Sequence, residues 1–331
     1  MSTGYTFPPG VPINPVRPIP DGEAPISIFG YIPNRAFAIV ALISFCLALI
    51  AHTYFLVRIK STRTFQSLMA FAALCEVVGY AARLSASNNP FIVVKFVVQY
   101  FFIVVAPTFV QSAFYIAIAD ALRRLEGGGR TLLGFNPKIL VIVLITADTI
   151  TTIVQIAGAA LIGVAESSEY RDGKSSTVTS DQANDILLAG LSLQEASFLA
   201  FLILLGVCSY RSRKTTIEAS LPSRFIVVFF AGSMLLFLRT SYRLAETATG
   251  VFSFASRTEP LFACLEYLPV ILAVLLLVAF PLYKLLPPVH PSHLASSSDP
   301  EHQRFAMQPE TSNASSPTLV RSGEQKVVDG K

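Results

Sequence analysis

The sequence contains no tryptophan and few charged residues, and both absences restrict what the chain can be. Charged residues make up 14% of the 331 positions, whereas 53% of the positions are hydrophobic. A soluble domain usually carries about 25% charged residues. The composition is therefore that of a membrane protein. The net charge of +4 is small, and we expect no nucleic-acid partner.

Cysteine and histidine are too sparse for a disulfide framework or a metal site. The four cysteines all fall in hydrophobic segments and form no C-x-x-C pair. A zinc-dependent hydrolase needs about three His or acidic ligands around an open metal position. His52 is the only histidine in the hydrophobic segments. We therefore expect no metal, no cofactor and no enzymatic activity.

The sequence also lacks the lysine that is characteristic of two further classes of protein. The stretch "EGGGRTLLG" has no P-loop lysine, so we expect no ATP-hydrolysing domain. A retinal protein would need a lysine in the middle of its last helix, and Lys284 lies too close to the end of the last hydrophobic segment.

What the sequence has instead is a series of long apolar segments. A transmembrane helix needs about 20 predominantly apolar residues. Seven segments satisfy this requirement, at 36–57, 66–86, 91–119, 139–164, 186–209, 225–249 and 260–286. They predict an all-α membrane protein with a seven-helix bundle.

The basic residues indicate how this bundle is oriented. They gather in the first, third and fifth loops, at Arg58, Lys60, Arg63, Arg123, Arg124, Arg130, Lys138, Arg211, Arg213, Lys214 and Arg224. Because basic loops stay in the cytoplasm, we expect the N-terminus outside and the C-terminus inside.

The chain ends differ from the membrane region in composition. Residues 1–34 are rich in proline and lack the basic start and apolar core of a cleavable signal peptide, so we interpret them as an extended extracellular tail. Residues 35–286 form the membrane domain. Residues 287–331 are rich in Ser, Pro and charge, and we expect a disordered cytoplasmic tail.

Polar residues recur on one face of several predicted helices. Glu76, Tyr80 and Arg83 are spaced i, i+4 and i+7, which places them on one helix face. The same spacing relates Asp148, Thr152 and Gln155, and again Arg239, Arg243 and Glu246. Further polar positions in the other segments are Gln111, Tyr115, Gln194, Glu195, Glu259 and Glu266. This pattern predicts a bundle with a polar, hydrogen-bonded interior.

Charges in such an interior must be compensated. A charged side chain at the bilayer centre costs about 2.5–3.5 kcal/mol on insertion scales. We expect the acids at 76, 148, 246 and 266 to neutralise the bases at 83, 239 and 243. An alternative is that these pairs only fix helix register and packing. For Glu259 and Arg257, at the outer boundary, solvation is the simpler interpretation.

Three prolines fall in the third and seventh segments. Pro107, Pro269 and Pro281 each remove a backbone hydrogen bond and can kink a helix. In a transporter such kinks can act as hinges, and a static kink is the alternative.

A seven-helix receptor is the main rival interpretation. The third segment ends in "YIAIADALRRL" without an Asp-Arg-Tyr cluster, and the seventh ends in "FPLYKLL" without an Asn-Pro-x-x-Tyr motif. Both features argue against the commonest receptor class. A receptor or sensor of a lipid-like ligand that regulates lipid asymmetry remains the alternative.

Six stretches together resemble the fungal RTA-like family of lipid-translocating exporters. These are "YIPNRAFAIV", "EVVGYAAR", "APTFVQSAFY", "DTITTIVQIAGAAL", "GLSLQEASFLAF" and "LRTSYRLAE". The seventh segment departs from the family pattern, because Glu266 stands where the family usually has Asp and the later His is absent.

The resemblance implies a multipass transporter that exports or flips amphiphiles such as sphingoid bases or sterol-like and porphyrin-like compounds, in lipid homeostasis and toxic-compound resistance. It also implies a plasma-membrane location, with an endomembrane as the alternative. The lipid substrate and the bilayer are the expected partners, and no protein partner is indicated.

On the basis of this resemblance, the head group would be surrounded by Glu76, Asp148, Glu246 and Glu266. Arg83, Arg239 and Arg243 would balance charge or bind an anionic head group, and Tyr80, Tyr115, Gln155 and Gln194 would supply hydrogen bonds.

Overall fold

The computed structural model describes residues 10–20, 22–125, 137–172, 179–212, 221–250 and 253–287. Within these ranges seven helices are long and apolar enough to cross a membrane. They are Arg35–Arg58, Lys60–Ala86, Val93–Arg123, Ile139–Ile162, Asp181–Ser212, Ser223–Ala248 and Glu259–Ala279. The seven predicted segments are thus confirmed as helices, and the same ranges contain isolated β-bridges but no named strand.

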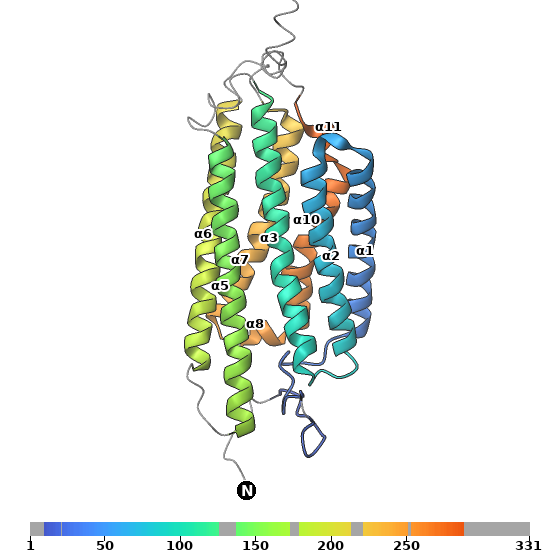
Figure 1. Cartoon of the computed structure of the whole chain (residues 1–331), viewed down its shortest axis with the longest axis vertical. Helices are drawn as coiled ribbons and strands as arrows, with labels where there is room; N and C mark the ends of the chain where they lie inside the picture. The colour runs from blue at the N-terminus through green and yellow to red at the C-terminus, as the bar shows by residue number, and fades with distance from the viewer. Residues whose placement is uncertain are drawn as a thin grey trace, which may run out of the picture. The chain divides into compact units, whose positions relative to one another are not determined.

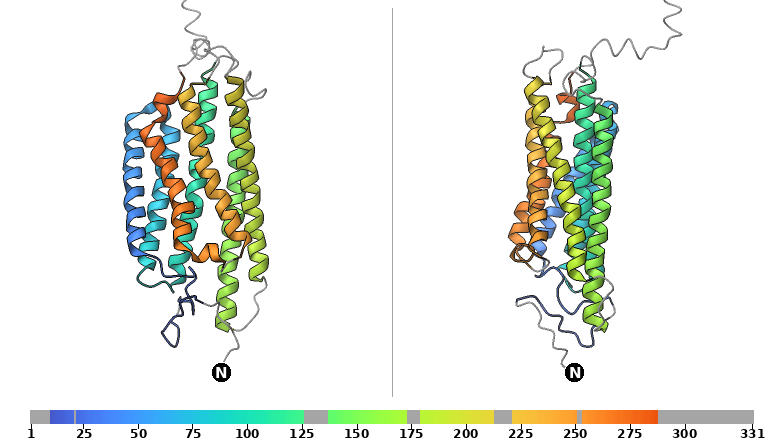
Figure 2. Two further views of the ribbon diagram at one scale, coloured as in Figure 1. Left: turned by 180° about the vertical axis from the view of Figure 1, so that it is seen from behind. Right: turned by 90° about the vertical axis from the view of Figure 1, so that its left-hand side faces the viewer.

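The first six spans correspond to single helices. These are α1 (Arg35–Arg58), α2 (Arg63–Ala86), α3 (Val93–Arg123), α5 (Pro137–Asp172), α6 (Ser180–Ser212) and α7 (Ser223–Ala248), with a short 3₁₀ turn, η1 (Lys60–Thr62), between the first two. Helix α2 packs between α1 and α3, while α5 pairs with α6 on the other side of the bundle (Figure 1). Helix α7 contacts both α6 and the last span (Figure 2).

The seventh span is divided into short pieces. It comprises α8 (Phe254–Arg257), α9 (Glu259–Leu261), the π-helical turn η4 (Phe262–Tyr267), α10 (Leu268–Ala279) and α11 (Leu282–Leu285). Pro281 was predicted to lie inside this helix, which is wrong. Helix α10 ends at Ala279 and Pro281 is the N-cap of α11, because proline cannot donate the next helical hydrogen bond.

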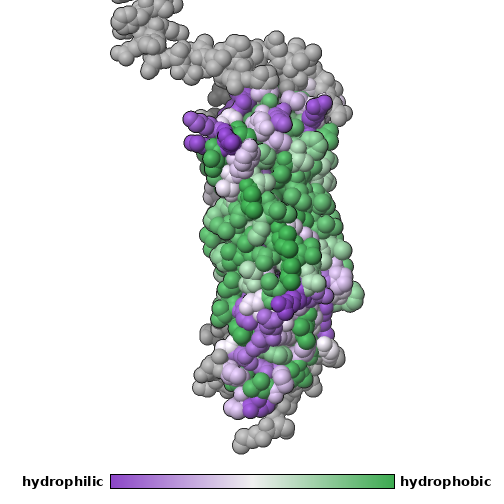
Figure 3. Space-filling view, turned by 90° about the vertical axis from the view of Figure 1, so that its right-hand side faces the viewer, coloured by the Kyte–Doolittle hydropathy of each residue, from purple (hydrophilic) through white to green (hydrophobic). Residues whose placement is uncertain are grey.

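One face of the bundle shows an apolar band between two polar zones (Figure 3). Exposed apolar side chains of the spans include Ile43, Ile50 and Ile153, as expected for helices that face lipid. Inside, aromatic rings and small residues pack closely. A Cβ on Gly232 would lie 2.6 Å from a ring carbon of Phe114, so glycine is what allows α7 to approach α3 here.

The N-terminal segment packs against the loop after α2. The Glu23 carboxylate accepts hydrogen bonds from Asn14 and Asn89, and the N–H of Ala24 donates to the carbonyl of Phe91 at 2.8 Å. The described part of the segment is therefore folded, in contrast to the extended tail that its proline content suggests. The predicted cytoplasmic tail lies outside the described residues from position 288 onward.

Candidate functional site: a charged interior beside a cavity

Arg83 is fully buried near the end of α2, inside a cage of aromatic rings. Its Nη2 atom lies 2.5 Å from Oε1 of Glu259 and donates to Oη of Tyr31 at 2.9 Å. Its guanidinium carbon lies 4.6 Å from the ring centroid of Phe262 and 5.4 Å from that of Phe37. Cation–π contacts of this kind stabilise a desolvated guanidinium.

Glu259 is the residue whose role the sequence did not reveal. The expectation that it is solvated is wrong, because it pairs with Arg83 and also accepts the backbone N–H of Asn34 at 2.9 Å. Helical spacing identifies residues on one helix face, whereas Glu259 reaches Arg83 from the short α9. Burial raises the pKa of the neighbouring Tyr31, an effect that the Arg83 guanidinium opposes in part.

A second group of ion pairs lies between α7 and η4. Glu266 is buried and holds two bases, with its Oε1 2.6 Å from Nη2 of Arg239 and its Oε2 3.0 Å from Nε of Arg243. Arg243 also pairs with Glu246 at 3.2 Å and lies over the ring of Tyr100. The predicted compensation of these bases by Glu246 and Glu266 is confirmed.

Glu76 is buried between these groups without an ion pair. Its side chain makes no hydrogen bond or salt bridge to any residue that the structure describes, and its Oε2 atom is an unpartnered acceptor. Arg239, Arg243 and Glu266 are the charged groups that act on it electrostatically. The expectation that Glu76 neutralises one of the three bases is not met among the described residues, since Arg83 pairs with Glu259 and the other two bases pair with Glu246 and Glu266.

We define the charged network as the seven residues Glu76, Arg83, Arg239, Arg243, Glu246, Glu259 and Glu266. It contains four carboxylates and three guanidinium groups. One carboxylate is therefore in excess when all seven side chains are ionised.

We define the neutral network as Gln111, Gln155 and Gln194, on the other side of the bundle between α3, α5 and α6. Gln155 Nε2 donates to Gln194 Oε1 at 2.6 Å, and Gln194 Nε2 donates to Gln111 Oε1 at 3.1 Å. Tyr115 Oη donates to Asp148 Oδ2 at 2.7 Å. Asp148 was predicted to neutralise a base, which is wrong: its side chain accepts a hydrogen bond from the Tyr115 hydroxyl and pairs with no base among the described residues, because α5 packs mainly against α3 and α6.

Tyr80 makes no hydrogen bond to any described residue of either network. It is buried, and its ring stacks on Phe45 at a centroid distance of 5.5 Å and meets Tyr267 edge-on at 5.7 Å. The structure therefore places this residue in an aromatic cluster between α1, α2 and the last span.

Two of the three predicted hinge residues lie inside helical structure. Pro107 is in the interior of α3, and Pro269 is in the first turn of α10, directly after the π-helical turn that carries Glu266. A π-turn is rare and frequently occurs at functional sites. The broken geometry of the last span thus coincides with the acid that holds two arginines.

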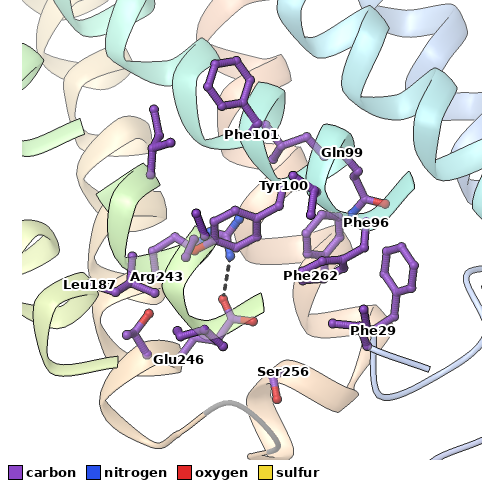
Figure 4. Close-up of a pocket in the computed structure, with 18 of the residues that line it drawn as sticks. Phe29, Phe96, Gln99, Tyr100, Phe101, Leu187, Arg243, Glu246, Ser256 and Phe262 are labelled. Carbon is purple, nitrogen blue, oxygen red and sulfur yellow. Dashed lines mark hydrogen bonds and ion pairs between the residues drawn. The ribbon is translucent and has the colours of Figure 1, made fainter. Parts of the chain in front are cut away.

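The charged network adjoins a partly open cavity of about 190 Å³. Most of its lining is apolar and comes from α3, α5, α7 and the N-terminal segment. The polar lining includes Arg83, Gln99, Arg243 and Glu246. Figure 4 shows Arg243 between Tyr100 and Glu246, with Gln99, Phe96 and Phe262 on the adjacent wall.

Gln99 is a cavity residue that the sequence analysis missed. Its side chain is buried, yet its Oε1 atom has no hydrogen-bond partner among the residues that the structure describes. The only available signal was a single glutamine in the apolar run "VVKFVVQYFF", which shares no repeated spacing with the other polar positions.

Comparison with known proteins agrees with this architecture. The sequence model of the RTA1 like protein family matches residues 69–288. The sphingoid long-chain base transporter RSB1 of Saccharomyces cerevisiae, strain Lalvin EC1118, is 25% identical over 289 residues, which cover 76% of this chain and 72% of the relative. RSB1 of strain S288c matches with the same identity and coverage. No solved structure matches the chain. The family match spans most of the membrane domain, and the chain belongs to the RTA1-like family.

Proposed function

We propose that this chain is a transporter of single-chain cationic amphiphiles, with sphingoid long-chain bases as the first class to test. The similar yeast protein is named as a transporter of sphingoid long-chain bases, which suggests this class. The proposal concerns movement of an intact lipid between leaflets and not a chemical change in it.

The excess carboxylate of the charged network is the observation that carries this proposal. Glu76 has no cationic partner among the described residues, although the network around it is buried and adjoins a cavity. A buried unpaired charge is costly, and intramembrane carboxylates of this kind mark substrate or proton pathways. The ammonium group of a sphingoid base would supply the fourth cation, while its chain stays in an apolar environment.

Orientation and coupling complete the proposal. The basic loops favour an N-terminus outside and a C-terminus inside, with residues 287–331 as a cytoplasmic tail, and the family resemblance favours the plasma membrane. On this orientation the cavity faces the outer half of the bilayer. We expect transport to run down a gradient or to be coupled to protons through a carboxylate such as Glu76.

The test is reconstitution of the purified protein into liposomes with a fluorescent sphingoid base. We expect the wild type to accelerate appearance of the lipid in the opposite leaflet. We expect Glu76→Gln to reduce this rate about tenfold, or about 1.4 kcal/mol, because the charged network then no longer has a carboxylate in excess to attract a cation. Asp120→Asn is the matched control, since Asp120 is a half-exposed carboxylate that pairs only with Arg124.

Two results would change the proposal. Correctly folded wild type that moves no lipid would leave a receptor or a regulator of lipid asymmetry as the better function. Transport that responds neither to a proton gradient nor to Glu76→Gln would exclude proton coupling through Glu76.

A further inference from the structure

We propose that the cavity is a lateral binding site at which one amphiphile enters the protein from the bilayer, between α3 and α5. This inference rests on the proposed function for its choice of ligand. It goes further in naming the site, the direction of access and the residues that receive the head group.

The mouth of the cavity lies on the lipid-facing surface. Val97 and Phe101 of α3 line the cavity and are also 46% and 38% exposed. Ala159 and Ala160 of α5 line the opposite side and are small. A wall residue that is also exposed marks an edge of the opening, so the cavity opens sideways between these helices and is reached without passing through water.

The depth of the mouth suits a lipid head group. Gln99 is the seventh residue of α3, about 9 Å from its start at a rise of about 1.5 Å per residue. Arg243 is at a comparable distance from the last residue of α7. The polar lining is thus close to one end of the spans, where the head groups of one leaflet lie.

The polar end of the cavity favours a ligand that carries both a positive charge and additional hydrogen-bond donors. Glu246 is the half-buried acid at this end, and it shares its single base, Arg243, with Glu266. Gln99 presents an acceptor without a partner. An ammonium group bound to Glu246 and a hydroxyl group donating to Gln99 would satisfy both, and the amino-alcohol head of a sphingoid base carries these two groups.

The volume favours one chain. Pockets for drug-sized ligands usually measure about 300–1,000 Å³, whereas this cavity measures about 190 Å³. It has room for a small head group and the first part of one chain. The rest of the chain would leave between α3 and α5 into the bilayer, and a two-chain lipid with a large head group would not fit.

The lack of tryptophan provides a direct binding assay. Phe101→Trp would create the only tryptophan in the chain, at the mouth of the cavity. Binding of a sphingoid base with a brominated chain should quench its fluorescence in nanodiscs. The N-acetylated analogue, with the same chain but no charge, separates the head-group contribution from the chain contribution.

Three variants in the Phe101→Trp background test the site. Ala159→Phe should weaken binding of both ligands about tenfold or more, because the ring occupies the cavity. Glu246→Gln should weaken the amine about tenfold and the acetylated analogue less than about twofold, as expected for loss of a charge-assisted hydrogen bond. Ile153→Phe is the matched control, since Ile153 lies on the outer face of α5 and is 61% exposed, and it should change neither affinity.

The outcomes separate this inference from the proposed function. Each variant is first checked for native size and thermal unfolding. Gln99→Leu serves as a second head-group variant if Glu246→Gln does not fold. Equal binding by wild type and the folded Ala159→Phe variant, with liposome transport intact, would overturn the site but not the function. Binding with the predicted pattern but no transport would retain the site and assign it to a sensor.

Discussion

The charged and the neutral network are both buried in the same bundle, but the helices around the charged network leave a cavity, whereas those around the neutral network are closely packed. The charged network adjoins the cavity between α3, α5 and α7. The neutral network lies where α5 and α6 pack closely: a Cβ on Gly158 would be 2.8 Å from the backbone nitrogen of Leu187. The ion pairs thus adjoin the hollow part of the interior, whereas amides bridge the close-packed part, where the buried carboxyl of Asp148 accepts a hydrogen bond from Tyr115.

The physical reason for this difference is solvation. A charge buried among close-packed helices has to be paired completely by protein groups, and an incomplete pair is strongly destabilising. The glutamines Gln155, Gln194 and Gln111 are linked by two hydrogen bonds of modest energy, and Nε2 of Gln111 has no partner among the described residues. An unpaired amide costs less than an unpaired charge. The charged network retains, at Glu76, a carboxylate without an ion pair to any described residue, and three other members of this network, Arg83, Arg243 and Glu246, line the cavity.

Among the variants that test this comparison, Glu266→Leu is expected to lower the free energy of unfolding most. The change leaves Arg239 without its carboxylate in a site where that side chain is 3% exposed, and an uncompensated buried charge costs about 3–5 kcal/mol. We expect a corresponding loss of unfolding free energy, measured by denaturation in detergent micelles. Arg239→Met combined with Glu266→Leu should recover most of the loss. A double variant as unstable as the single one would show that the pair is not what Glu266 provides.

A smaller effect is expected where the neutral network depends on close packing. Gly158→Ala would force a methyl group against the backbone of Leu187, and overpacking usually costs about 1–3 kcal/mol. Gly206→Ala is the matched control, because no atom lies within 4 Å of its Cβ position and alanine is the better helix former. Thermal unfolding should place the first variant below the wild type and the second at or above it. Equal behaviour of the two variants would contradict the close approach of α5 and α6.

The smallest effect is expected from Gln194→Leu. Two side-chain hydrogen bonds are lost, and such bonds in membrane proteins average about 0.6 kcal/mol each, so we expect about 1 kcal/mol in total. Ser192→Ala on the same helix is the control, because Ser192 is exposed and bonds only to its own helix backbone. A loss as large as that of Glu266→Leu would remove the distinction between the two networks.

The seven helices and the polar faces could be predicted because they depend on local patterns. Apolar length indicates a span, and i, i+4, i+7 spacing places Arg239, Arg243 and Glu246 on one face whatever the neighbouring helices are. The confirmed pairing of Arg243 with Glu246 is a contact within α7. Contacts between helices were predicted less well, since Arg83 pairs with Glu259 and Asp148 with Tyr115.

By itself, therefore, the sequence determined the membrane class, the number of spans and which side chains had to face inward, because these follow from the free energy of placing each residue in lipid. Only the tertiary structure decided which acid met which base, that Glu76 was left without a partner, and that a cavity with Gln99 in its wall opened between α3 and α5. Those features depend on the rotation and spacing of helices against one another, and on a last span divided at η4 and Pro281. The spacing of residues along the sequence gives neither the rotation of a helix nor its distance from its neighbours.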